Sequence, residues 1–373
     1  MKKYVFIIVI LLGLLINAHA ISDETEEIFD ATGAEKILDI ETDVFESFDT
    51  TEFVRNLFDG VAMDVESVFT KIVKYIFRSF RRNIRLCLAV VGICYIMGLY
   101  SNFQNELGGK GVSQAGYVVF YCVLAGVLSS AFVGISEVAG VAIENTGVMI
   151  KSLMPILITL LTTSGGVISG SLLASVLILL ANIVLLVIET IVLPLIYCSF
   201  AMSLAANMSE RIKLTKTVPF LHKMIKWLLL FTMVAFSSLF GIYGMSGYTM
   251  DATTGKLVRF AIGTSVPIVG GVAADSFEAV LSTLAIARNL VGISGVVAIL
   301  VTLLGPFLET VVIMWIFKLC AVVVEPFSDS RTVKLLTDAS ECITMLFSVL
   351  ISVALIFIGG IGIVLVTGNF VLR

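Results

Sequence analysis

The sequence has few of the side chains that enzymes use for catalysis. It contains two histidines in 373 residues, and its six cysteines include no CxxC pair. Because His19 lies in a leader-like segment, His222 remains alone, which excludes an HExxH zinc site and a histidine-based triad. A Walker motif and a GxGxxG sequence opening a helix are also missing. We therefore predict no catalytic residue, metal or cofactor, and we expect His222 to be solvated in a basic loop.

Charged residues are scarce as well, and hydrophobic residues are abundant. Charged residues make up 14% of the chain and hydrophobic residues 58%, with a mean hydropathy of +1.06. The apolar runs after residue 84 are too long and too many for a soluble core. This predicts an all-α, polytopic helical membrane protein of six to ten spans, surrounded by lipid. We expect no nucleic-acid partner, and we expect the cysteines to be small buried hydrophobic residues.

The N-terminal part has two sections. Residues 1–20 have a basic start, an apolar core and the ending Ala18-His19-Ala20, which predicts a signal peptide cleaved after Ala20. Residues 21–83 would then be extracytoplasmic. Their first part is acidic: between Ile21 and Glu66 there are fifteen acidic residues and two basic ones. Apolar residues at helical spacing then predict an amphipathic helix, which could lie on lipid headgroups or dock on a partner. Its end carries a basic cluster: Lys71, Lys74, Arg78, Arg81, Arg82 and Arg85.

Two plain transmembrane helices are expected within residues 84–135. The stretch Met154–Ser171 that follows is apolar, but Pro155 lies at its start and Gly165-Gly166 near its end. A hydrophobic piece of about a dozen residues between such breakers is typical of a discontinuous or re-entrant membrane helix, since a full span needs about 20 residues. The alternative is an ordinary span with a kink.

The rest of the chain suggests a parallel duplication of about 120 residues, with 136–248 as one membrane repeat and 249–373 as the second. Glu189-Thr190 is followed 120 positions later by Glu309-Thr310, and each copy places a basic loop before its last span. The same face of the membrane should therefore hold both loops. The apolar stretch 167–207 would measure about 60 Å as a helix, so it is either a hairpin near Glu189 or one long helix.

Glu189 and Glu309 are the strongest polar candidates. An acid within an apolar stretch is costly and usually faces a cavity, a partner or a water path. The alternative is that each acid marks a hydrated hairpin turn. Breakers near these segments would either shape half-helices that line a path or allow close helix packing. These candidates are Pro155, Gly165, Gly166, Pro267, Gly270 and Gly271.

The order of these features resembles the stage III sporulation protein AE family over essentially the whole chain. The most specific part is the run MPILITLLTTSGG at residues 154–166. The resemblance implies a component of the complex encoded by the stage III A operon, made in the mother cell and located in the membrane around the forespore. There it would form a transenvelope channel with its sister proteins and a forespore-side partner, supporting late gene expression in the forespore. The family supplies no catalytic residue.

Two other functions fit the same residues. One is a secondary transporter that couples to protons or cations through Glu189 and Glu309. The other is a non-conducting scaffold that recruits partners through residues 21–83. Homo-oligomers are compatible with each of these functions.

Overall fold

The described part of the protein is built from long helices. The computed structural model describes residues 65–107, 110–208, 216–265 and 270–371, and within them the chain forms helices and turns but no strand. This confirms the all-α prediction. The elements are α5 (Val65–Leu107), α6 (Lys110–Thr163), α7 (Val167–Val187), the π-helix η1 (Ile188–Val192), α8 (Leu193–Met208), α9 (Thr217–Ser265), α10 (Gly270–Val324) and α11 (Ser330–Val371).

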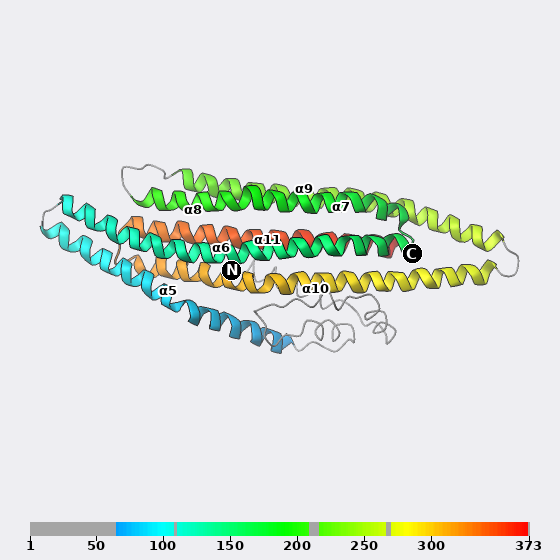
Figure 1. Ribbon diagram of the computed structural model, residues 1–373, viewed down its shortest axis with the longest axis horizontal. Helices are drawn as coiled ribbons and strands as arrows, with labels where there is room; N and C mark the ends of the chain where they lie inside the picture. The colour runs from blue at the N-terminus through cyan, green and yellow to red at the C-terminus, as the bar shows by residue number, and fades with distance from the viewer. Residues whose placement is uncertain (1–64, 108–109, 209–215, 266–269, 372–373) are drawn as a thin grey trace.

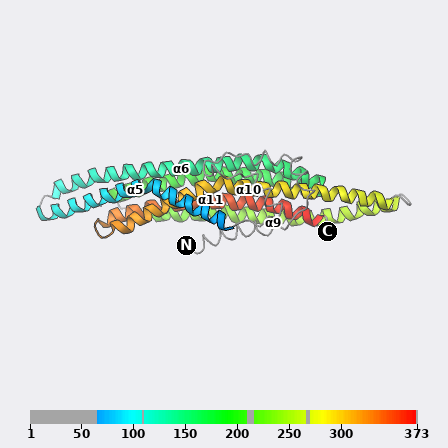
Figure 2. The same ribbon diagram turned by 90° about the horizontal axis from the view of Figure 1, so that it is seen from below.

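The helices lie side by side along one long axis (Figures 1 and 2). Successive long helices run in opposite directions, so α5 and α6, then α7–η1–α8 and α9, then α10 and α11 form three helical hairpins (Figure 1). Helix α11 lies at the centre, where it packs against α6, α8, α9 and α10. In the most apolar 18-residue window of α10 and of α11, 56% of the residues are buried, against 22% in α5. The last hairpin is therefore the core of the bundle.

Six helices are long and apolar enough to cross a membrane. This count, made on the described residues, lies at the lower end of the predicted range. The candidate spans run to 48 residues, or about 72 Å, whereas a hydrocarbon core is about 30 Å thick. The bundle is thus longer than a bilayer is thick.

Pro155 does not break a helix. It lies inside α6, which continues to Thr163, so the short half-helix beginning at Pro155 is not observed. A proline removes one backbone donor and frees the carbonyl four residues earlier, here that of Lys151, yet α6 continues. Thr159 Oγ1 donates to the carbonyl of Pro155 itself at 2.8 Å, and in α10 Thr310 Oγ1 donates to Pro306 O at 2.6 Å.

The break in this stretch is the turn at residues 164–166. Gly166 N donates to Leu161 O at 3.0 Å and Gly165 N to Thr162 O at 3.4 Å, which is the bond pattern of a Schellman helix end. Gly165 has φ 100°, a conformation that favours glycine because it has no Cβ. The predicted breaker therefore closes a helical hairpin between α6 and α7.

The apolar stretch 167–207 is one long helix and not a hairpin. Helices α7 and α8 join through η1, and together they form a continuous candidate span from Val167 to Met208. Glu189 lies in the π-turn, and Glu309 lies in the interior of α10. Neither acid marks a hairpin turn, so that alternative is wrong for both.

Several predicted borders fall inside helices. Helix α5 continues through residues 83 and 84, α6 through 135 and 136, and α9 through 248 and 249. The predicted signal peptide, the acidic residues up to 64, and Pro267 lie outside the described residues. Gly270 and Gly271 are the first residues of α10.

The segments of the predicted duplication run in parallel. Helices α7–η1–α8 and α10 point in one direction, and α9 and α11 point in the other (Figure 1). His222 of α9 also contacts Cys342 of α11, 120 positions later, with 3.6 Å between Nε2 and Sγ. This arrangement agrees with parallel copies, while the duplication itself stays a prediction.

Candidate functional site

The strongest candidate site is a charged cavity between α5, α6 and α10. It has a volume of about 410 Å³, and Glu309 lies in its wall. Arg82 Nη2 donates to Glu309 Oε1, and Tyr75 OH donates to the same oxygen at 3.3 Å. The cavity is lined by Arg82, Asn83, Leu86, Val127, Ser130, Ala131, Gly134, Ile135, Val138, Glu309 and Ile313.

Burial differs between the two charged partners. The side chain of Glu309 is 20% exposed, whereas that of Arg82 is 63% exposed. Removing a carboxylate from water is costly unless a cation and hydrogen-bond donors accompany it. Arg82 and Tyr75 supply both, which explains how α10 holds an acid within an apolar helix.

Small residues on α6 help to keep this space open. Ser130 and Gly134 lie one turn apart on the wall facing Arg82 and Glu309. An added Cβ at Gly134 would meet no atom within 4 Å. The cavity therefore combines a charged pair with polar and small side chains, an arrangement suited to a hydrated path or to a small polar solute.

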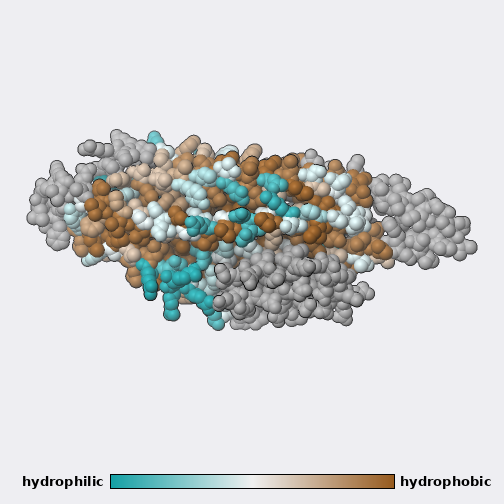
Figure 3. Space-filling model, in the orientation of Figure 1, coloured by the Kyte–Doolittle hydropathy of each residue, from teal (hydrophilic) through white to brown (hydrophobic). Residues whose placement is uncertain are grey.

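Arg82 belongs to the predicted basic cluster of α5. Hydrophobic side chains cover much of the face shown in Figure 3, and hydrophilic side chains gather on α5. The described members of this patch are Lys74, Arg78, Arg81, Arg82 and Arg85, all exposed. One of them, Arg82, turns to the bundle and pairs with Glu309, so one member of the basic cluster and the intramembrane acid belong to the same site.

Glu189 is not part of this cavity. It is exposed on the π-turn, and no hydrogen bond or ion pair of its side chain is found within the described ranges. Pro155 is also exposed, on α6, while Gly165 and Gly166 form the α6–α7 turn. Of the sequence-predicted candidates whose surroundings the structure describes, only Glu309 lines the charged cavity.

A second polar cluster lies between α8, α9 and α11. His222 is 4% exposed, and its Nδ1 donates to Glu341 Oε2 at 2.8 Å. The expectation that His222 is solvated was therefore wrong. Nearby, Asn207 Nδ2 donates to Asp338 Oδ2 at 3.3 Å. These bonds hold the start of α9 and the end of α8 against the first turns of α11.

A buried arginine supports the α6–α7 turn. Arg288 of α10 is fully buried, and its Nη1 donates to Ser164 Oγ at 2.8 Å. A Cβ added at Gly368 would lie 1.8 Å from Arg288 Nη1, so only glycine fits there without a shift. We did not single out Arg288 from the sequence. Its signal is a cation inside the apolar stretch 279–324, which is rare and costly in membrane helices.

Neither a cluster of metal ligands nor a disulfide occurs in the part of the chain that the structure describes. Within the described residues, no group of three or more His, Cys, Asp or Glu side chains could hold a metal ion. The cysteines there are free. Cys94, Cys320 and Cys342 are buried as expected and Cys87 is half-buried, but Cys122 and Cys198 are exposed, so the expectation was wrong for these two.

Comparisons with known proteins identify the family. The family model for stage III sporulation protein AE matches residues 48–368. The chain belongs to this family. It is 26% identical to stage III sporulation protein AE of Bacillus subtilis (strain 168) over 295 residues, which cover 79% of this chain and 74% of the relative. No solved structure matches the chain. Membership of this family supports a role in sporulation, and the match includes all residues of the charged cavity.

Proposed function

We propose that this sporulation protein is the membrane-embedded component of a transenvelope channel between mother cell and forespore, and that it catalyses no reaction. In this proposal it resides in the mother-cell membrane around the forespore, with its N-terminal segment extracytoplasmic. It works there with other proteins of the stage III A operon and a forespore-side partner. Family membership and six candidate spans support a sporulation role in a membrane.

One observation carries the channel part of the proposal: the Arg82–Glu309 pair lines a cavity between three helices. Ionisable residues inside a membrane bundle usually face a water-filled space or mark a substrate path. A pair needed only for packing could be replaced by apolar residues at little cost. Here Tyr75 adds a third polar group to the same carboxylate, and the wall opposite is small and partly polar.

A transporter that used both acids as equals is less well supported. Coupling through two carboxylates would bring them to a shared site, but Glu309 lines the cavity and Glu189 lies on the outer surface of the bundle. The scaffold alternative is separated from the channel by experiment, because a scaffold does not need the charges of the Arg82–Glu309 pair.

The test uses Glu309→Gln, with Glu189→Gln as its matched control. Each variant replaces the chromosomal gene in an endospore-forming host, and heat-resistant spores and late forespore gene expression are counted. Accumulation in the membrane and co-purification of other stage III A proteins are measured in parallel. We expect Glu309→Gln to lower spore formation at least tenfold while the protein accumulates and assembles, and we expect Glu189→Gln to retain it.

A charge exchange sharpens this test. If the pair matters as a pair, Arg82→Glu combined with Glu309→Arg should recover part of the activity that either single variant loses. Normal spore formation by Glu309→Gln would refute a role for the charged cavity and favour the scaffold. Loss of co-purification by this variant would show that the pair serves assembly and not passage.

A further inference from the structure

The outer face of α7 carries a stripe with the spacing of a coiled-coil seam. Its positions step alternately by four and three residues, a repeat of 3.5. One set of positions is leucine throughout, and the other set is mostly polar. In order, the stripe is Ile168, Leu172, Ser175, Leu179, Asn182, Leu186 and Glu189. We name it the α7 seam.

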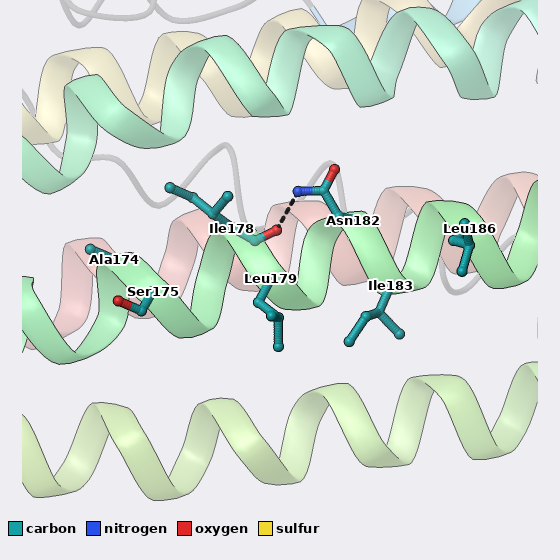
Figure 4. A pocket seen from close by; sticks show the side chains of 7 residues that line it. All are labelled: Ala174, Ser175, Ile178, Leu179, Asn182, Ile183 and Leu186. Carbon is teal, nitrogen blue, oxygen red and sulfur yellow. Dashed lines mark hydrogen bonds between the residues drawn. The ribbon is translucent and has the colours of Figure 1, made fainter.

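The α7 seam is not covered by the rest of the bundle. Leu172 is 37% exposed, Leu179 60% and Leu186 63%. Ser175 and Asn182 are exposed as well. Ser175, Leu179, Asn182 and Leu186 line an open groove of about 540 Å³ together with flanking residues of α7, Ala174, Ile178 and Ile183 (Figure 4). A seam that packed only within its own chain would bury these leucines.

Lipid cannot cover the whole of this helix. The continuous span from Val167 to Met208 has 42 residues and is about 63 Å long. At the largest common tilt, about 40°, it would still extend about 48 Å along the membrane normal, against a hydrocarbon core of about 30 Å. At least a third of the apolar helix therefore needs another cover.

The polar positions of the seam also favour protein over lipid. Asn182 Nδ2 donates to Ile178 O at 2.8 Å, which uses one of its two amide hydrogens (Figure 4). Lipid tails offer no partner to the rest of the amide, whereas Asn and Ser side chains form hydrogen bonds between packed helices. A single Asn in a leucine seam also fixes the register of the helices.

We propose that the α7 seam binds the α7 seam of a second copy of this chain, side by side and parallel. Copies inserted in the same direction are related by an axis along the membrane normal, so each seam position meets its own counterpart. An amide is both donor and acceptor, and so is a hydroxyl, so Asn182 and Ser175 are each complementary to themselves. The leucines between them interdigitate as in a parallel two-stranded coiled coil.

Charge argues against the other segment of this chain that could cover the groove. Residues 21–66 carry fifteen acidic and two basic residues, and the seam itself ends in Glu189. Like charges would repel such a segment. In the pair of seams, repulsion is confined to the last position, where the two Glu189 side chains approach each other and where the π-turn ends the helical repeat.

The first experiment is disulfide crosslinking of the full-length protein in its native membrane. The two exposed cysteines, Cys122 and Cys198, are first replaced by serine. Ser175→Cys then places a thiol on the seam, and Ser152→Cys places one on exposed α6 as control. Both sites lie within about three turns of the α6–α7 turn, so their depth along the bundle is similar. Copper-phenanthroline oxidises paired thiols, and dimers are quantified on a non-reducing gel.

We expect Ser175→Cys to give at least fivefold more dimer than Ser152→Cys. The proposal is overturned if the two variants crosslink equally. A Ser175→Cys product whose mass shows a different protein in place of a second copy also overturns it, as does a monomer that stays uncrosslinked.

The second experiment measures self-association of the purified protein in detergent by dilution. Asn182→Leu removes the hydrogen bond but keeps the leucine character of the seam, so it should weaken dimerisation about three- to thirtyfold. Glu189→Gln removes the repulsion and should strengthen dimerisation. Unchanged self-association in Asn182→Leu contradicts the proposal. Asn182→Leu leaves Glu309, Arg82 and Glu189 untouched, so the result for this variant is independent of the channel test.

Discussion

The turn that closes the α6–α7 hairpin gives a quantitative test of the fold. Gly165 has φ 100°, and the left-handed region costs an L-residue about 1–2 kcal/mol relative to glycine. Gly165→Ala should therefore destabilise the protein by about that amount. A matched substitution in α6 should do the opposite, because Gly140 has no atom within 4 Å of an added Cβ. Alanine there should stabilise the helix by about 0.5–1 kcal/mol.

The free energies of unfolding of Gly140→Ala and Gly165→Ala should therefore differ by about 2 kcal/mol, which is roughly thirtyfold in the folding equilibrium. The assay is thermal unfolding in detergent, followed with a thiol-reactive fluorophore. The exposed Cys122 and Cys198 are first replaced by serine. Cys94 and Cys342 are fully buried and react only when the bundle opens. If Gly165→Ala were as stable as Gly140→Ala, residue 165 would not have a positive φ, and α6 and α7 would not be joined by this turn.

Two further predictions test the packing of distant segments. Cys87 and Cys320 Sγ atoms lie 3.4 Å apart, so copper-phenanthroline should join α5 to α10 within one chain and remove two free thiols. Cys87→Ser should prevent this loss of free thiols, whereas Cys94→Ser should not. If the unsubstituted protein kept both thiols, the contact between Cys87 and Cys320 would be contradicted. His222→Ala should destabilise the protein by about 0.5–1.5 kcal/mol, because it removes a hydrogen bond to the half-exposed Glu341 carboxylate. His222→Asn should recover part of that loss in the same unfolding assay, and a fully stable His222→Ala would show that the bond is not formed.

The fold could be predicted from the sequence where hydrophobicity alone decides it. The apolar runs predicted long helices suited to a membrane. The glycine pair at 165–166 predicted a break, and the chain reverses direction there. The role of Pro155 could not be predicted in this way, because α6 continues through it to Thr163. Whether a proline ends or only perturbs a helix depends on the packing around it, which a search for breakers does not include.

The sequence predicted only one of the two charged residues of the site. Glu309 stands out as an acid in an apolar stretch, but its partner Arg82 lies 227 residues earlier and belongs to a cluster that looked like a headgroup-binding patch. Pairing over such a separation follows from how the hairpins pack, and no local pattern encodes it. His222 did have a local signal: Ile225, Leu229 and Phe236 continue its buried face at helical spacing.

The π-turn at Ile188–Val192 has a consequence for how the long helix evolved and how it can be edited. A π-turn holds one residue more than an α-turn, so the register of α8 is offset from that of α7 by about 100°. Deleting Thr190 would remove the extra residue and restore a regular helix, so the faces of α8 would keep their orientation. Ile196 and Phe200 would stay buried, so the long helix can lose this one residue without misplacing half a span.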